Sequence, residues 1–420
     1  MELGVRIVGW RCAASMALAV ALSVTAGCGR DETTAEPSAG QPTSGASAGA
    51  TVSGAGLEWT QVTLDMLLIG GYTTVPVGDG FIGVRVDSTK TLAVDPGGSK
   101  ISGMTVVTSP DGMSWADAAG TGLADDEAVR WLGGGPWGAV GYVATMEDEE
   151  RAPTEVIFTA DGSEFVRGSV PVEGLGLGSE AGVFAAAVAE PGVVAIVMSP
   201  QSQGIGGTAA LFSADLQEWQ PVGFEDGDSP LVLGTAGFGV AGSPLGFWVT
   251  ASRLADSQSQ PQVFGYFSPD GRNWQAVAVP EPYGDVAAVS GWRDGFVMVT
   301  TKAGGSPTGL LSSDDGLSWS EMGGDPLSGL SSVDSLSGSS LGVMVLSAFT
   351  GAGSPEPVLV FSADGQTWQR STTQELFGLD SSLVEAMGEN SVLVGTHPEA
   401  EDDEEDRDST QLWVGVPPRG

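Results

Sequence analysis

Residues 311–319 read LSSDDGLSW, and related segments recur along the chain at nearly even spacing. The third-position aspartates of successive segments lie 44 to 55 residues apart. A period near fifty residues, with turn-forming residues at a fixed offset, indicates a radial or stacked array of similar units. The six copies are 109–115 (SPDGMSW), 159–165 (TADGSEF), 213–219 (SADLQEW), 268–274 (SPDGRNW), 312–319 (SSDDGLSW) and 362–368 (SADGQTW).

Each copy has the composition of a β-hairpin turn. An apolar run such as 156–158 (VIF) predicts a strand, and the aspartate and glycine then reverse the chain through side-chain-to-backbone hydrogen bonds and a permissive φ. The aromatic residue opens the return strand. Because this role needs no ligand, we interpret the repeated aspartates as structural: Asp111, Asp161, Asp215, Asp270, Asp314 and Asp364.

The copies resemble the Asp-box, or BNR repeat, of the sialidase-like β-propellers, whose pattern is S-x-D-x-G-x-x-W. Residues 312–319 match its full spacing, the other five copies are one residue shorter, and Leu216 replaces the glycine in one of them. The resemblance implies a structural turn between the third and fourth strands of a blade, on the face opposite the binding site. The same design occurs in assembly factors and in sialidases, so it implies a scaffold and leaves the chemistry open.

A second set of apolar runs, most of them opening with glycine, predicts the strand before each hairpin. The two ends of the chain complete one unit, because 411–416 has the pattern of a third strand and 57–60 that of a fourth. The sequence therefore predicts an all-β fold, a seven-bladed β-propeller of four-stranded antiparallel blades, closed by pairing of the N- and C-terminal strands. The runs are 80–86, 138–144, 192–198, 246–250, 295–300, 342–346 and 392–395.

Seven aromatic residues occupy equivalent positions at the start of the expected fourth strands. We expect each ring to pack between neighbouring blades, because a single amphipathic sheet cannot bury both of its faces alone. The residues are Trp59, Trp115, Phe165, Trp219, Trp274, Trp319 and Trp368.

The first residues have the pattern of an export signal. Residues 1–27 carry two arginines and then an apolar run, 13–24, that is shorter than the roughly 20 residues of a spanning helix. The small residues before Cys28 resemble the bacterial lipobox, which implies lipidation of Cys28, although Thr25 leaves cleavage by the general signal peptidase open. Removal of 1–27 would leave one cysteine and no disulfide framework.

This pattern also predicts the domain organisation and location. Residues 28–55 are rich in Ser, Thr, Ala, Gly and Pro, which is typical of a flexible tether, and 56–420 would form the propeller. We expect a protein held by its lipid at the outer face of the cytoplasmic membrane. The abundance of small residues is typical of a high-GC Gram-positive bacterium.

The charge balance is strongly acidic. With 16 basic and 53 acidic residues the net charge is −37, which disfavours nucleic acid and anionic lipid as partners. The acidic runs 147–150 and 399–408 are typical of solvated loops between second and third strands. No cofactor is expected beyond weak capture of a divalent cation such as calcium, for which the candidate ligands are Asp402, Asp403, Glu405 and Asp406.

Several classes of enzyme are disfavoured. The resemblance to sialidases would imply three arginines and a tyrosine paired with a glutamate, but no Arg-Ile-Pro motif is present and Arg130 alone adjoins an expected inner strand. His397 is the only histidine, so neither a zinc site nor a Ser-His-Asp triad is supported.

We expect a monomeric, non-catalytic binding or assembly module at the cell surface, with a protein or glycan partner on the face that carries the links between blades. The alternative is a glycoside hydrolase that uses paired carboxylates on that face.

Overall fold

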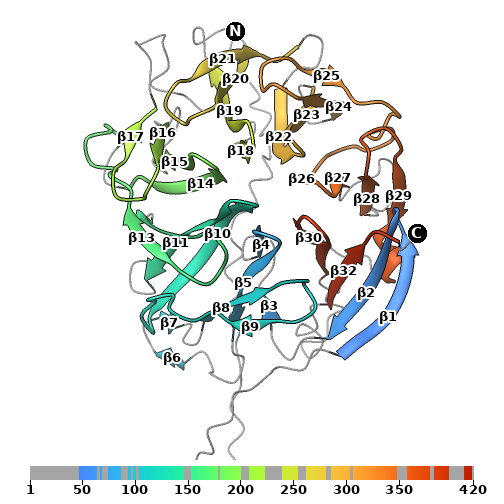
Figure 1. The fold of residues 1–420 in the computed structure, drawn as a ribbon, viewed down its shortest axis with the longest axis horizontal. Helices are drawn as coiled ribbons and strands as arrows, with labels where there is room; N and C mark the ends of the chain where they lie inside the picture. The colour runs from blue at the N-terminus through green and yellow to red at the C-terminus, as the bar shows by residue number, and fades with distance from the viewer. Residues whose placement is uncertain are drawn as a thin grey trace, which may run out of the picture. The chain divides into compact units, whose positions relative to one another are not determined.

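The described part of the chain is built almost entirely of β-strands (Figure 1). The computed structural model describes residues 47–63, 67–68, 74–86, 93–95, 98–100, 104–145, 153–177, 180–199, 208–222, 239–253, 262–280, 285–302, 306–347, 357–378, 383–396 and 411–418.

Four antiparallel sheets have four strands each, in sequence order. They are β14 (Gly182–Ala189), β15 (Gly192–Met198), β16 (Thr208–Ser213) and β17 (Gln220–Pro221); β18 (Val240–Ser243), β19 (Gly246–Arg253), β20 (Gln262–Ser268) and β21 (Gln275–Ala278); β22 (Asp285–Trp292), β23 (Gly295–Thr301), β24 (Pro307–Ser313) and β25 (Ser320–Glu321); and β26 (Ser335–Ser339), β27 (Gly342–Ser347), β28 (Val358–Ser362) and β29 (Gln369–Thr372).

A nine-stranded sheet contains two further sets of the same order. The sets meet at one parallel bridge between Val77 and Gly135, and β3 (Leu67–Leu68) pairs with β5. A separate hairpin consists of β6 (Ala93–Asp95) and β7 (Gly98–Lys100). The two sets are β4 (Val75–Val77), β5 (Gly80–Val86), β8 (Met104–Ser109) and β9 (Ala116–Asp117), and β10 (Glu127–Gly135), β11 (Gly138–Thr145), β12 (Glu155–Thr159) and β13 (Val166–Ser169).

The remaining sheet joins both ends of the chain. Its order is β30 (Leu383–Met387), β31 (Val392–Thr396), β32 (Gln411–Val416), β2 (Leu57–Thr63) and β1 (Ser47–Gly54), and β2 pairs with β32 in antiparallel register. The tether expected over 28–55 is wrong for its last residues, because 47–54 form β1. Backbone pairing with β2 and the packing of Val52 on the core hold this Ser- and Gly-rich strand in place.

The first strands of successive sets lie next to one another around a common centre (Figure 1). Their contacts run from β4 to β10, β14, β18, β22, β26 and β30, and β30 contacts β4. Radial repetition of four-stranded antiparallel sheets is the β-propeller architecture. The described residues therefore have a β-propeller fold.

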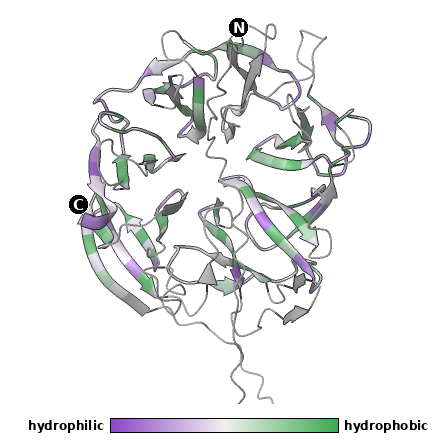
Figure 2. Ribbon diagram, turned by 180° about the vertical axis from the view of Figure 1, so that it is seen from behind, coloured by the Kyte–Doolittle hydropathy of each residue, from purple (hydrophilic) through white to green (hydrophobic). Residues whose placement is uncertain are grey.

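Burial follows the position of each strand in its sheet. In β23 six of the seven residues are buried, whereas both residues of β17 and of β25 are exposed. Inner and middle strands lie between two neighbouring sheets and read as continuous apolar runs, and the outermost strands meet solvent. Figure 2 shows the same gradient, with hydrophobic segments on the inner strands and hydrophilic ones toward the rim.

In the described part of the chain, neighbouring four-stranded sets pack through separate apolar clusters, and each cluster includes one of the seven aromatic residues. Trp59, Trp115 and Trp274 are buried to 6% exposure or less. The other four rings are only partly buried: Phe165, Trp219, Trp319 and Trp368.

Two further features differ from the sequence-based expectation. The box predicted at 312–319 is shifted, because Asp315, and not Asp314, accepts the turn hydrogen bonds and pairs with Ser313. This copy therefore has the same S-x-D-G-x-x-W spacing as its counterparts. Helical periodicity is absent from the sequence, yet α1 (Thr373–Phe377) forms one short helix behind a capping box of Thr372 and Glu375.

Candidate functional site

A cavity of about 590 Å³ lies where the first strands converge. Its lining comes from β4, β10, β14, β18, β22, β26 and β30 and from the hairpin turns that follow six of them. In the longer strands β10, β14 and β22, the lining residues lie in the half that leads into the hairpin turn. The volume lies within the roughly 300–1,000 Å³ that is common for small-ligand sites.

The hairpin turns at the cavity share a face of the molecule with the repeated turns that contain Asp111, Asp161, Asp215, Asp270, Asp315 and Asp364. The turns at the cavity follow the first strand of each set, and the repeated turns follow the third strand. In an antiparallel set the first and third strands run in the same direction, so both kinds of turn lie at the same end of the sheet. A direct contact supports this, since Nη2 of Arg293, beside the cavity, donates to the carbonyl oxygen of Ala363 in the next box at 2.9 Å. The expected binding face, which carries the links between blades, is therefore at the other end from this cavity.

Glycines allow the first strands to approach backbone to backbone at the cavity wall. A Cβ at Gly242 would lie 1.9 Å from the carbonyl oxygen of Val188, and one at Gly291 would lie 2.2 Å from that of Gly242. Gly134 meets the carbonyl of Pro76 in the same way, at 2.0 Å. Small residues at these positions are required because any side chain would push neighbouring sheets apart.

The lining has an apolar side and a polar side. Leu132, Pro136 and Trp137 line it from β10 and the turn to β11, and Trp137 is partly buried against the neighbouring core. The polar side comes from the turns after β22, β26 and β30, which bring Arg293, Asp294, Ser340 and Glu389 to the same cavity.

Hydrogen bonds and stacking hold the polar side in place. The Arg293 guanidinium lies over the Trp292 ring, 4.9 Å from its centroid, and Arg293 itself has a left-handed φ of 50°. The Ser340 hydroxyl donates to Glu389, and the Ser339 hydroxyl donates to the carbonyl of Gly388 at 2.8 Å. A non-glycine residue with positive φ at a cavity is often part of a functional site.

The opposite ends of the first strands carry other polar residues. Arg130, on β10, donates from Nη1 to the Tyr142 hydroxyl at 3.5 Å. At the start of β22, burial raises the pKa of the Asp285 carboxyl above its ordinary value. These side chains are not part of the cavity lining.

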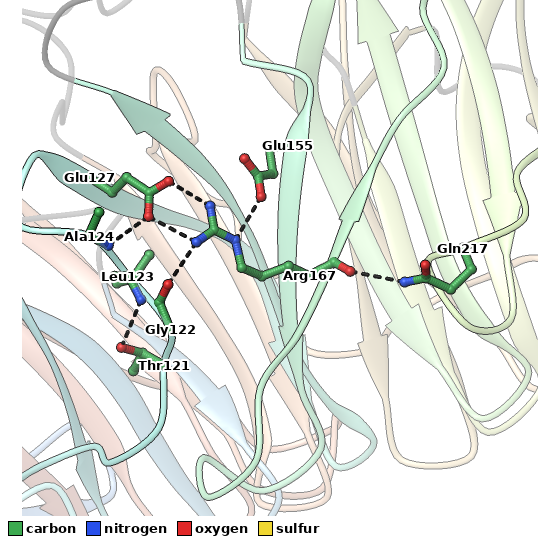
Figure 3. Close-up of polar contacts among 8 residues, drawn as sticks. All are labelled: Thr121, Gly122, Leu123, Ala124, Glu127, Glu155, Arg167 and Gln217. Atoms are coloured by element: carbon green, nitrogen blue, oxygen red, sulfur yellow. Dashed lines mark hydrogen bonds and ion pairs between the residues drawn. The ribbon is translucent and has the colours of Figure 1, made fainter.

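The acidic segment 125–127, on the link into β10, supplies a structural ion pair (Figure 3). Arg167 Nη2 lies 2.7 Å from Glu127 Oε1, its Nη1 donates to Oε2 at 2.9 Å, and its Nε donates to Glu155 at 2.7 Å. The bond to Arg167 lowers the pKa of Glu127, and both glutamates raise that of Arg167. Glu127 thus fastens the link to β13.

Aspartates in the repeated turns bond the backbone of the turn through Oδ1. Oδ1 of Asp215 accepts from the backbone N–H of Gln217 at 2.8 Å and of Glu218 at 3.0 Å, and the Glu218 bond leads in lowering the pKa of Asp215. Partial burial opposes the shift at Asp270, but bonds from Asn273 and Arg272 lower its pKa to about 2. Backbone N–H groups donate equivalent hydrogen bonds to Oδ1 of Asp111, Asp161, Asp315 and Asp364.

Several predicted site residues lie outside the described residues. These include Cys28 and the candidate calcium ligands Asp402, Asp403, Glu405 and Asp406. Among the residues that the structure describes, no three His, Cys, Asp or Glu side chains are placed to hold a metal ion. Within the same ranges, no helix has the length and apolar character needed to cross a membrane.

No model of a known protein family matches the sequence, and no curated protein is significantly similar to it. Solved structures with a similar fold include puromycin hydrolase (12% identity, 79% of this chain and 50% of that one, TM-score 0.48). Others are the β-propeller domain of the Trilobed protease from Pyrococcus furiosus (11%, 79% and 99%, 0.45) and the phage phi92 endosialidase (9%, 87% and 70%, 0.40). At these identities and scores, no activity or site residue transfers to this chain.

Proposed function

We propose that the chain folds as a closed seven-bladed β-propeller. Each half of the nine-stranded sheet counts as one blade, and the sheet that joins both chain ends is the last blade. The pairing of β2 with β32 and the contact of β30 with β4 support closure. Closure removes the free edges that a linear array would expose, and the seven interface clusters fit one aromatic ring between each pair of blades.

We propose that this propeller is a non-catalytic binding module that holds a protein or glycan partner. The observation that carries the proposal is the axial cavity of about 590 Å³, whose lining combines apolar surface with a few convergent polar side chains. The acidic groups seen in the Asp-box turns and in the Arg167 network are already bonded within the fold. In the cavity, by contrast, Arg293, Asp294 and Glu389 come from three different turns to one concave surface.

The module is proposed to be a monomer exported and lipidated at Cys28, with residues 1–27 removed, and to act at the outer face of the cytoplasmic membrane. The lipobox-like TAGC sequence at 25–28 supports this placement. Mass spectrometry of the mature N-terminus tests it. A diacylglycerol adduct on Cys28 is the expected result, and an unmodified chain that starts before Cys28 would reject it.

The binding proposal is tested with a variant that fills the cavity. Gly135 lines the cavity and a Cβ added there meets nothing within 4 Å, so Gly135→Phe adds a bulky side chain at the cavity wall without a clash at its Cβ. Ala116→Phe adds the same side chain at an exposed outer strand and serves as the matched control.

Wild type and both variants are applied to a printed glycan array and a displayed peptide library, and released sugar is measured. We expect a ligand that wild type and Ala116→Phe retain and Gly135→Phe loses, without release of sugar above a heat-denatured sample. Cavity-dependent release of sugar would establish the glycoside hydrolase instead. Ligands retained equally by all three proteins would reject the cavity as the binding site.

A further inference from the structure

The two sides of the cavity match the two kinds of surface on a sugar ring. A pyranose has patches of C–H groups on its faces, which pack against aromatic rings, and hydroxyl groups around its edge. Trp137 presents an indole ring at one side of the cavity, with Leu132 beside it. Arg293 comes from the turn after β22, three first strands around the ring from β10, and Glu389 from the turn after β30, two first strands away in the other direction. A ligand in the cavity would therefore meet an apolar surface on one side and hydrogen-bonding groups on the other.

The polar groups are planar and oriented. Carboxylates accept, and a guanidinium donates, pairs of hydrogen bonds of the kind that adjacent hydroxyls offer and require. Stacking on Trp292 and the bond to Ala363 fix the plane of Arg293 while using one of its donors. The bond from Ser340 restrains Glu389 in the same way. Such restraint reduces the entropy lost when a ligand binds.

Charge selects among sugars. The cavity lining contains two carboxylates, Asp294 and Glu389, and one guanidinium, Arg293, on a chain with a net charge of −37. This balance repels an anionic sugar such as a sialic acid and accepts an uncharged one. Because seven first strands surround the cavity, access is along the axis and favours a chain end over the middle of a polymer.

We propose that the axial cavity binds the end of an uncharged glycan, with Trp137 against its C–H face and Arg293, Asp294 and Glu389 bonded to its hydroxyls. This inference rests on the proposed binding function and names the ligand class of the same cavity.

The test is titration calorimetry of the exported chain with methyl glycosides of glucose, galactose, mannose and N-acetylglucosamine, and with methyl sialoside as the anionic probe. We expect one or more neutral glycosides to bind and the sialoside to bind at least tenfold more weakly, about the effect of one unfavourable charge contact. Trp137→Ala should weaken neutral binding about tenfold, the effect of losing one aromatic contact, and Trp137→Phe should restore most of it. Glu389→Ala should weaken it by a similar factor.

Three results would overturn the inference. They are the absence of neutral glycoside binding at millimolar concentration, tighter binding of the sialoside, and neutral binding that Trp137→Ala and Gly135→Phe leave unchanged. A sugar-free peptide that binds in a Trp137-dependent way would also reject the glycan while leaving the binding function intact. If the wild-type protein binds neither peptides nor glycans, the proposed binding function itself is rejected.

Discussion

Replacement of Gly242 by alanine tests whether the first strands truly pack backbone to backbone. The new Cβ would lie 1.9 Å from the carbonyl oxygen and 2.7 Å from the carbonyl carbon of Val188. Neither partner is a flexible side chain, because β18 is paired along its length with β19 and β14 with β15. The two sheets must therefore separate to admit the methyl group.

The magnitude follows from what that separation disturbs. Overpacking of a well-packed core costs about 1–3 kcal/mol, and here the apolar cluster between the same two sheets, which includes Phe212 and Phe247, would also open. Alanine lowers the conformational entropy of the unfolded chain relative to glycine, and this stabilises the fold by only about 0.4–1 kcal/mol. We expect Gly242→Ala to lose about 3 kcal/mol in its free energy of unfolding.

Gly135→Ala is the matched control, because it makes the same chemical change on another first strand, β10, where a Cβ meets nothing within 4 Å. It should change stability by no more than about 1 kcal/mol, in the stabilising direction. Urea unfolding followed by tryptophan fluorescence measures both, with the slopes compared to detect any change in cooperativity. Equal midpoints for the two variants would refute the close packing at Gly242.

Three further predictions address the turns, the interfaces and the ion pair. The folded state lowers the pKa of Asp270 from 3.8 to about 2, so ionised Asp270 stabilises the fold above pH 3.8 and this stabilisation is lost as the pH falls toward 2. The difference in stability between wild type and Asp270→Asn should therefore shrink over that pH interval. A constant difference would contradict the prediction. Trp274→Ala should cost about 3–5 kcal/mol and Trp219→Ala clearly less, because the Trp274 ring is buried and the Trp219 ring only partly buried; equal thermal shifts would argue against the interface role. Arg167→Lys should cost about 1–2 kcal/mol, because lysine cannot reproduce the bidentate contact with Glu127. Arg85→Lys, at a more exposed ion pair, should cost under about 1 kcal/mol. Calorimetric melting of both variants measures the difference.

The repeated turns could be predicted because their chemistry is local. An aspartate, a glycine and a preceding serine within four residues suffice to bond the turn backbone, whatever the rest of the chain does. The misassignment at 312–319 arose because two serines and two aspartates adjoin the glycine. Only the aspartate directly before Gly316 places its Oδ1 within reach of the backbone N–H of Leu317 and Ser318, which selects Asp315.

Strand β1 could not be predicted because its own residues carry no strand signal. Its composition, SAGATVSG, is that of a linker, and nothing in it alternates strongly between apolar and polar residues. The segment becomes a strand through pairing with β2, and the position of Gly54 against Leu376 leaves no room for a side chain. Leu376 is far away in sequence, and the segment's own composition carries no strand signal, so composition alone predicts a tether.

The cavity residues were missed for a related reason. Trp137, Arg293 and Glu389 each lie in or beside a short turn between two strands, where a polar or bulky residue needs no special explanation. They belong to three different repeats, and no spacing rule connects them. Only the meeting of the first strands around one centre brings them to the same cavity.

Residues that recur in the repeated units hold the fold together, whereas residues that differ between the units line the cavity. Positions that recur in six of the four-stranded sets, such as the serine or threonine and the aspartate of the repeated turns, are already bonded inside the set. Positions where the units differ include the turns after the first strands, which carry Pro136 and Trp137 in one unit, Arg293 and Asp294 in another and Glu389 in a third. A ring of identical turns would give a symmetric cavity with no preferred orientation for a ligand. Because these turns differ, the cavity has an apolar and a polar side, and it is this departure from the repeat that can select a partner.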